Sequence, residues 1–321
     1  MKRVAVRLGQ LGLTLVVTWF ILTRVGVDLA ALREVNRAEW TPDPWIFAAS
    51  CIVLLCGYLF SAGLWGRIVR DLGGPTIPLW TAMRLFMVAN LGRYVPGKVW
   101  QIAGLALLAK RHGVSAGVAT GAAVLGQGVA LMGAALLGVA TLFGPNEIWR
   151  RFGLVGLVGG LLAASGIIAI VAVPTLFQRV MNAWYRVTRT DAPETPLDGG
   201  PLALKWFTLY LLNWGIYATA FWLLYLSLGD WRTFLEIGPA FAAAYVVGYL
   251  AVFAPAGAGI REGFLVLLLQ PSMSAEAALV VALAARVWTT TVEVVPAAFF
   301  AATLSDNIAD ARSSNTGTSV S

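Results

Sequence analysis

The sequence predicts an all-α polytopic membrane protein, with about six transmembrane helices and two re-entrant half-helix hairpins arranged as an inverted repeat. Three observations lead to this fold class. Hydrophobic residues make up 59% of the chain and charged residues 12%, about half of the charged fraction of a soluble domain. Apolar runs near the length of a bilayer crossing recur along all 321 residues. Two of the runs are interrupted by Gly- and Pro-rich stretches, and these interruptions align with each other.

Six apolar segments have the length of a full transmembrane helix, for which about 20 residues are needed. The first segment follows Lys2, Arg3 and Arg7, as the core of a signal peptide would. No small-residue cleavage site comes after it, so we expect it to remain as a span. The predicted spans are residues 8–23, 44–66, 116–143, 152–174, 204–228 and 275–303.

Two further apolar stretches, residues 79–110 and 234–270, do not have the pattern of single spans. The first is interrupted around Pro96 and the second around Pro255. Each half is too short to cross a bilayer alone, which is typical of a re-entrant hairpin made of two half-helices. One kinked spanning helix at each place is the alternative, because proline can bend a helix without ending it.

Basic residues near the span ends predict the orientation. With both interrupted stretches re-entrant, most Lys and Arg residues fall on the side that carries the two termini. The positive-inside rule then places both termini in the cytoplasm, and we expect a multi-pass protein of the plasma membrane. Residues 1–305 are expected to form a single transmembrane domain. The polar residues 306–321 are expected to form a disordered cytoplasmic tail.

A shift of 159 residues superimposes the two interrupted stretches without a gap. The pairs that it aligns include Pro96/Pro255, Gly104/Gly263 and Ser115/Ser274. The repeat units cover about residues 79–143 and 234–303, and three full spans separate the two interrupted stretches, so the second unit is inverted relative to the first. Inverted repeats with broken helices are typical of secondary transporters, whose sites lie at the breaks. Two unrelated proline-kinked helices are the alternative.

Charged residues occur in both interruptions and in the last span. Such a residue at the centre of a membrane helix costs about 2.5–3.5 kcal/mol, so we expect these residues to face a polar cavity. Four are basic and two acidic, which favours an anionic ligand: Arg93, Lys98, Arg261, Glu262, Arg286 and Glu293. Arg286 and Glu293 lie two helical turns apart, too far for an easy direct pair, and we expect each to reach the second hairpin. Arg93 and Lys98 have the alternative of extending to the membrane interface.

The helix starts at both interruptions strengthen the predicted anion site. Pro96 and Pro255 fit the first turn of a helix, where free N–H groups and the helix dipole attract negative charge. Gln101 is expected either to donate a hydrogen bond to a lipid head group or to join two helices. Three glycines would let a phosphate group approach the backbone closely: Gly97, Gly257 and Gly259.

Several other classes of site are excluded. Gly92 to Lys98 match most of a nucleotide-binding phosphate loop, but Val99 stands where Ser or Thr is required and no strand precedes it, so we exclude an ATPase. His112 is the only histidine, and the two cysteines lie in one apolar run, which gives no metal cluster. We therefore expect no metal and no cofactor. The net charge of +7 is explained by basic residues that set the membrane orientation and contact lipid head groups, and no nucleic-acid partner is expected.

The motifs Asn90 to Gln101 (NLGRYVPGKVWQ) and Pro255 to Glu262 (PAGAGIRE) resemble the paired motifs of the lysylphosphatidylglycerol synthase transmembrane-region family, also called flippase-like domain proteins. The resemblance covers about residues 5–305. This family includes the flippase part of the multiple peptide resistance factor, which moves aminoacylated phosphatidylglycerol between leaflets. It also includes proteins associated with polyprenyl-phosphate sugars and hopanoids. The synthases carry a soluble aminoacyltransferase domain after the membrane region, and we expect this chain to lack synthase activity.

The resemblance implies lipid translocation. We expect a flippase or transporter, not an enzyme, that moves an anionic phosphate-containing lipid between leaflets, either a phospholipid or a polyprenyl-phosphate-linked sugar. Its phosphate is expected between the hairpin tips, bound by Arg93, Lys98, Arg261 and Arg286. Two alternatives stay open: a membrane transferase acting on a lipid phosphate, and an accessory subunit that positions a lipid. The expected partners are the bilayer, a second copy of the chain, and a glycosyltransferase or another lipid-modifying enzyme.

Overall fold

The computed structural model describes residues 41–95, 99–142, 148–188, 201–229, 231–251 and 254–316, and these ranges contain helices and turns without any strand. Four helices are long and apolar enough to cross a membrane. They are α2 (Pro44–Asp71), α5 (Ala116–Val139), α8 (Pro201–Ser227) and the first part of α11 (Ala275–Thr316). These helices coincide with four of the six predicted spans. The predicted span 8–23 lies outside the described residues.

The predicted span 152–174 corresponds to α6 (Ile148–Ala172), which turns sharply into α7 (Pro174–Thr188). The two helices are bent by 103° at Val173 and pass as a fifth apolar span only when they are taken together. Pro174 explains the bend, because proline fits the first turn of a new helix and has no N–H for the preceding one. The described residues thus hold four to five helices of membrane-spanning character.

Both interrupted stretches are broken helices, as predicted. The first consists of α3 (Leu79–Asn90), a 3₁₀ turn (Leu91–Tyr94) and α4 (Val99–Lys110). The second consists of α9 (Phe234–Leu250), a 3₁₀ turn (Pro255–Gly257) and α10 (Ile260–Leu269). In each stretch the two halves pack against each other, so the chain folds back as a helical hairpin and does not continue as one kinked helix. We call these the first and the second hairpin.

Local sequence explains where the helices begin. Asp43 accepts hydrogen bonds from the N–H groups of Trp45 and Ile46 at 2.9 and 3.0 Å, and so caps α2. Ser115 and Ser274, which the repeat aligns, cap α5 and α11 in the same way. Their hydroxyls accept from the backbone N–H groups three residues on, at 3.3 and 3.2 Å. The long helix after each hairpin therefore starts with the same kind of N-cap, a serine hydroxyl.

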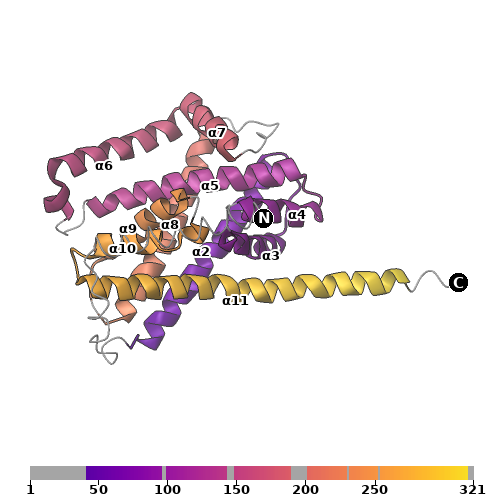
Figure 1. The fold of residues 1–321 in the computed structure, drawn as a ribbon. Helices are drawn as coiled ribbons and strands as arrows, with labels where there is room; N and C mark the ends of the chain where they lie inside the picture. The colour runs from indigo at the N-terminus through magenta and orange to yellow at the C-terminus, as the bar shows by residue number, and fades with distance from the viewer. Residues whose placement is uncertain are drawn as a thin grey trace, which may run out of the picture.

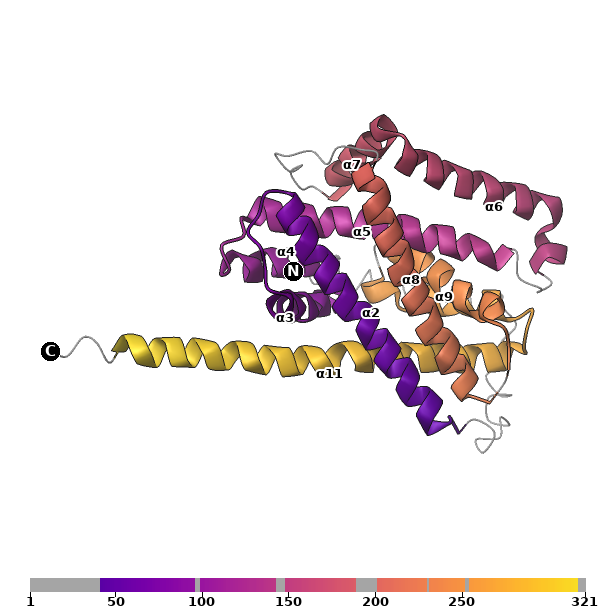
Figure 2. The same ribbon diagram turned by 180° about the vertical axis from the view of Figure 1, so that it is seen from behind.

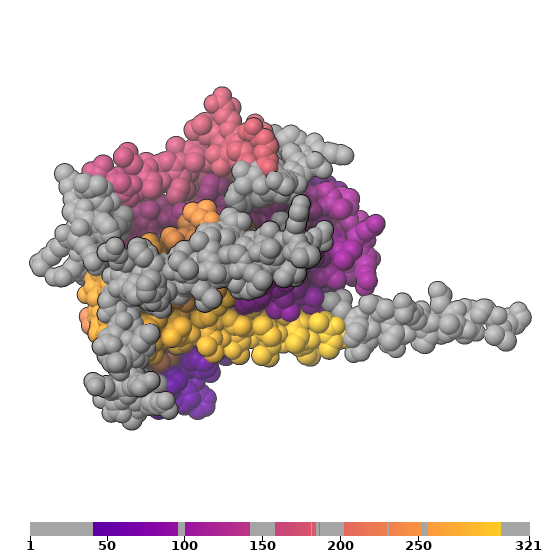
Figure 3. Space-filling model, viewed as in Figure 1, coloured from indigo at the N-terminus to yellow at the C-terminus, as the bar shows by residue number. Residues whose placement is uncertain are grey.

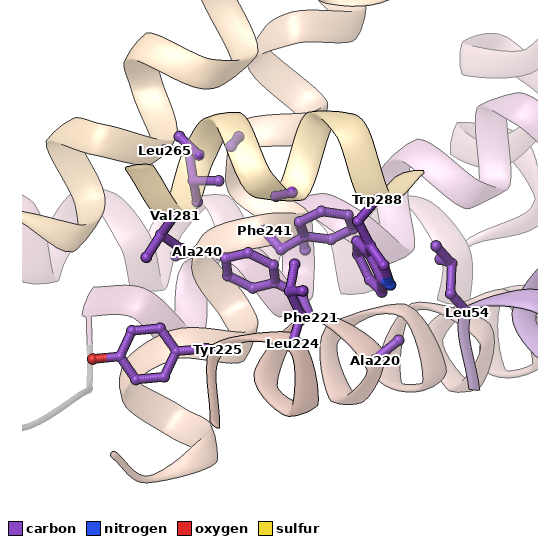
Figure 4. Close-up of a cluster of buried hydrophobic side chains, with 14 of the residues drawn as sticks. Leu54, Ala220, Phe221, Leu224, Tyr225, Ala240, Phe241, Leu265, Val281 and Trp288 are labelled. Carbon is purple, nitrogen blue, oxygen red and sulfur yellow. The ribbon is translucent and has the colours of Figure 1, made fainter. Parts of the chain in front are cut away.

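The core of the described residues contains two large apolar clusters, one beside each hairpin, and a small one at the second break (Ala251, Ala254 and Ile260). One cluster joins α3, α4 and α5 with the C-terminal half of α2 and the N-terminal half of α8. The other joins α9, α10 and α11 with the opposite halves of α2 and α8. Phe241 lies at the centre of this second cluster, stacked on Phe221 at 4.8 Å and set edge-on to Trp288 at 6.1 Å (Figure 4). The two long helices α2 and α8 pack side by side and connect the clusters.

The directions of the helices agree with two inverted units. Figures 1 and 2 show that α5 and α11, the long helices that follow the hairpins, run in opposite directions on either side of the hairpins. In the space-filling view α6 and α7 form one edge of the molecule and α11 crosses the opposite side (Figure 3). We expected a disordered tail from residue 306, but α11 continues as a helix to Thr316. Extending an existing helix avoids the cost of nucleation, which lets a polar segment remain helical.

Candidate functional site

The helix α11 lies against both hairpins and contributes one charged residue to each. It packs on α10 of the second hairpin and on α3 of the first. Arg286 and Glu293 are seven residues apart on this helix, a rise of about 10 Å. Arg286 contacts the second break and Glu293 contacts the first. The expectation that both residues reach the second hairpin is therefore wrong for Glu293, because α11 runs from one break to the other.

Glu293 is the centre of a buried polar cluster at the first break. Its carboxylate accepts hydrogen bonds from Arg93 Nη1 and the Tyr94 hydroxyl, both at 2.6 Å. The Tyr58 hydroxyl of α2 donates a third, at 2.5 Å. The side chain of Glu293 is only 3% exposed. Three donors from two separate segments thus satisfy one buried charge, as a low-dielectric site requires.

Arg93 is held inside the first hairpin. Besides its ion pair with Glu293, it donates from Nη2 to the Asn90 side-chain oxygen at 2.5 Å. Gln101 donates to the same oxygen at 2.7 Å, so it joins the two halves of this hairpin. The Arg93 side chain is 21% exposed. This geometry favours a partner inside the protein over extension to the membrane interface. Pro96, Gly97 and Lys98, the other predicted site residues of this break, lie outside the described residues.

At the second break, Arg286 and Glu262 form the corresponding pair. Arg286 Nη1 donates to the Ala256 carbonyl at 3.0 Å and to Glu262 Oε1 at 3.4 Å. The other oxygen of Glu262 accepts from the Gly259 N–H at 2.6 Å. Glu262 therefore caps the start of α10 with its own carboxylate, and one of the N–H groups that we expected an anion to use is already engaged.

The backbone of the second break is tightly folded. Pro255 opens the 3₁₀ turn, and Ala256, Gly257 and Gly259 all have positive φ, of 48°, 71° and 80°. A methyl group at Gly257 would lie 2.8 Å from the Gly248 carbonyl oxygen, so this position allows the break to pack against α9. A side chain at Gly248 would in turn lie 2.7 Å from Arg261 Cβ. Gly257 thus allows close approach to a neighbouring helix, and its close approach to a phosphate stays a prediction.

Arg261 differs from the other two site arginines. In the described part of the chain no carboxylate forms an ion pair with it. Its guanidinium lies over the Phe241 ring, 4.5 Å from the centroid. A cation on an aromatic face gains some attraction, but the face does not neutralise its charge. Within the described site, Arg93 and Arg286 are paired with glutamates and Arg261 is the remaining positive charge.

Arg261 faces a cavity between the two hairpins. The larger compartment leaves about 90 Å³ for the centres of water-sized molecules and the smaller about 40 Å³. Both compartments are lined by Arg93, Gln101, Tyr245, Tyr249 and Arg261. The structure therefore brings Arg93 and Gln101 of the first break and Arg261 of the second to both compartments, and Arg286 and Glu293 of α11 to the smaller one. The lining of the two compartments does not include the other described site residues, Pro255, Gly257, Gly259 and Glu262.

Several tyrosines in this site were not anticipated from the sequence. Tyr58 and Tyr94 bind Glu293, and Tyr245 and Tyr249 line both compartments. The spacing of four residues between Tyr245 and Tyr249, on an otherwise apolar helix, places two hydroxyls on one face and is a signal that could have found them. Tyr58 offers no such signal, because it meets Glu293 only through the packing of α2 on α11.

The comparisons with known proteins agree with the membrane character of these elements. No curated protein matches the chain. The family model for the lysylphosphatidylglycerol synthase transmembrane region matches residues 7–297, which include both breaks and all the site residues. The chain is therefore a multi-pass membrane protein that belongs to the lysylphosphatidylglycerol synthase transmembrane-region family.

Proposed function

We propose that this protein is a lipid flippase or transporter that moves an anionic, phosphate-containing lipid between the leaflets of the plasma membrane. The single observation that carries the proposal is Arg261, a cation that faces the cavity between the hairpins without a carboxylate partner among the described residues. Membership of a family of lipid-related membrane domains supports the same general role.

The charge of the cavity favours an anion over a cation. The described site contains Arg93, Arg261 and Arg286 against Glu262 and Glu293, so one positive charge remains after pairing. A charge away from bulk water is costly unless it is paired, and a lipid phosphate would supply the missing partner. Arg261 lines both compartments, so a phosphate beside it would also lie near Arg93 and Gln101.

The arrangement of the two hairpins supports movement across the membrane. Two inverted units that share one site can open it alternately to either side by shifting against each other. The opposite directions of α5 and α11, and the matched serine caps of these helices, are what such a repeat requires (Figure 1). We further propose that both hairpins are re-entrant and that both termini are cytoplasmic, from the distribution of basic residues.

Reconstitution into liposomes tests the function. Purified protein is incorporated into vesicles that contain phosphatidylglycerol with a fluorescent acyl chain, and an impermeant quencher reports the fraction that reaches the outer leaflet. We expect faster exchange than in protein-free vesicles. Failure to accelerate any anionic lipid, phospholipid or polyprenyl-phosphate sugar, would exclude a flippase. Mass spectrometry of the recovered lipids separates transport from chemistry, because a covalently altered lipid would favour the transferase alternative.

A further inference from the structure

We infer that the transported lipid carries an uncharged, hydroxylated head group beyond its phosphate, and that the larger compartment holds this head group. This inference rests on the proposed function and deepens it, since it selects one class of head group among phosphate-containing lipids. It is argued from the charge, the hydrogen-bonding groups and the ring packing of the compartment walls.

The charge of the larger compartment disfavours an amine. Among its described lining residues the ionised side chains are Arg93 and Arg261, and none is acidic. The nearest carboxylates are engaged elsewhere: Glu293 accepts from three donors, and Glu262 caps α10 and pairs with Arg286. An ammonium-bearing head group, such as ethanolamine or an aminoacyl group, would meet the Arg261 guanidinium there, which no described carboxylate pairs, beside an Arg93 that is already paired with Glu293.

The walls of the larger compartment offer neutral groups that both donate and accept hydrogen bonds. Asn213 of α8 donates to Ser61 of α2 at 2.7 Å, and Ser61 is 2.8 Å from the Tyr217 hydroxyl. Among the described residues, the Asn213 side-chain oxygen has no hydrogen-bond partner, although Asn213 is 1% exposed and lines the compartment. Within the same part of the chain, the Gln127 side chain makes one long hydrogen bond, at 3.4 Å to the Tyr245 hydroxyl. A hydroxyl group on a lipid head group can both donate and accept a hydrogen bond. It can therefore bind both the donor and the acceptor atoms of these amide and phenol side chains.

The aromatic side chains do not form an open cage for an amine. Trp214 packs edge-on against Tyr217, with ring centroids 5.3 Å apart, and at a tilt against Tyr245, with centroids 4.7 Å apart. Tyr245 stacks on Tyr249 at 6.0 Å. These contacts occupy part of the surface of each ring, which leaves less aromatic surface for a cation.

A set of four lipids with identical fluorescent acyl chains tests the inference in the same vesicles. Phosphatidylglycerol and phosphatidylinositol carry a phosphate with a hydroxylated group, phosphatidic acid carries the phosphate alone, and phosphatidylethanolamine carries an ammonium group. We expect the first two to exchange about tenfold faster than phosphatidylethanolamine, and phosphatidic acid to exchange more slowly than phosphatidylglycerol. Equal rates for phosphatidylethanolamine and phosphatidylglycerol, or for phosphatidic acid and phosphatidylglycerol, would overturn the inference.

A substitution in the wall locates the head group. Gln127→Met keeps the length of the side chain and removes its hydrogen bonds, while Gln178→Met on the exposed side of α7 is the matched control. We expect Gln127→Met to lower the ratio of phosphatidylglycerol to phosphatidic acid exchange about fivefold, the effect of one hydrogen bond, and the control to leave it unchanged. An unchanged ratio in Gln127→Met would contradict the placement of the head group in this compartment.

Binding separates this inference from the proposed function. If neither the four lipids nor a polyprenyl-phosphate sugar is moved, the flippase proposal fails, and native mass spectrometry of the purified protein with the same four lipids decides the head-group class. Preferential retention of phosphatidylglycerol and phosphatidylinositol would uphold the inference without transport. Equal retention of all four lipids would overturn it.

Discussion

Glu293 accepts a hydrogen bond from Arg93 at 2.6 Å, although the two residues are 200 positions apart in the chain. This pair links α11 to the first hairpin. Two turns earlier on the same helix, Arg286 binds the Ala256 carbonyl and Glu262 and so links α11 to the second hairpin. Any movement of one hairpin relative to the other must therefore act on α11 or break one of these links. We regard α11 as the element that couples the two breaks.

Loss of the charge on Glu293 should destabilise the protein. Glu293→Gln keeps the shape of the side chain but leaves Arg93 without a counter-ion in a nearly closed site, at a cost of about 3–5 kcal/mol. Thermal unfolding in detergent, followed by tryptophan fluorescence, measures the loss. The double variant Arg93→Gln/Glu293→Gln should recover part of it, with a coupling of about 0.5–3 kcal/mol. Additive effects of the two changes would show that the pair does not act as a unit.

Gly257→Ala should disturb the second break more than a glycine replacement elsewhere. The φ of 71° strains any L-residue, and the added methyl group would lie 2.8 Å from the backbone oxygen of Gly248. Gly229→Ala is the matched control, because its φ is 91° but no atom lies within 4 Å of the added group. Backbone strain should lower the free energy of unfolding of each variant by about 1–2 kcal/mol. In Gly257→Ala, crowding should lower it by about 1–3 kcal/mol more. Equal melting temperatures for the two variants would contradict this packing.

The inverted repeat predicts opposite labelling of two equivalent serines. Ser115 and Ser274 are both exposed and both cap the long helix after a hairpin. In a background with Cys51 and Cys56 replaced by serine, Ser115→Cys and Ser274→Cys should react with an impermeant maleimide from opposite sides of the membrane. The positive-inside assignment places Ser115 on the cytoplasmic side. Reaction of both cysteines from the same side would exclude inversion.

The positions of the breaks could be predicted from sequence because local composition determines them. The apolar runs on either side of Pro96 and Pro255 are too short to span a membrane, and the helices before them end at Asn90 and Leu250. Most of the long spans could also be predicted locally, from the length of their apolar runs. The helical extension to Thr316 did not, because composition does not show whether a polar tail continues an existing helix.

The partners inside the site depend on tertiary packing and could not be predicted. Sequence spacing placed Arg286 and Glu293 on one face of a helix, but the path of α11 past both hairpins decides that they bind different breaks. Tyr58 reaches Glu293 from 235 positions away. The role of Glu262 as a cap was not expected either, although a glutamate three residues after a glycine at a helix start is consistent with it.

The exchange rate of fluorescent phosphatidylglycerol in vesicles that contain the Arg261→Ala variant tests the central claim most directly. Arg111→Ala, which removes an exposed arginine from the end of α4, is the matched control. If Arg261 binds the lipid phosphate, its removal should slow exchange about tenfold or more while expression and melting temperature stay near those of the unmodified protein, and the control should exchange at the normal rate. Normal exchange in Arg261→Ala, or loss of folding in place of transport, would contradict the claim.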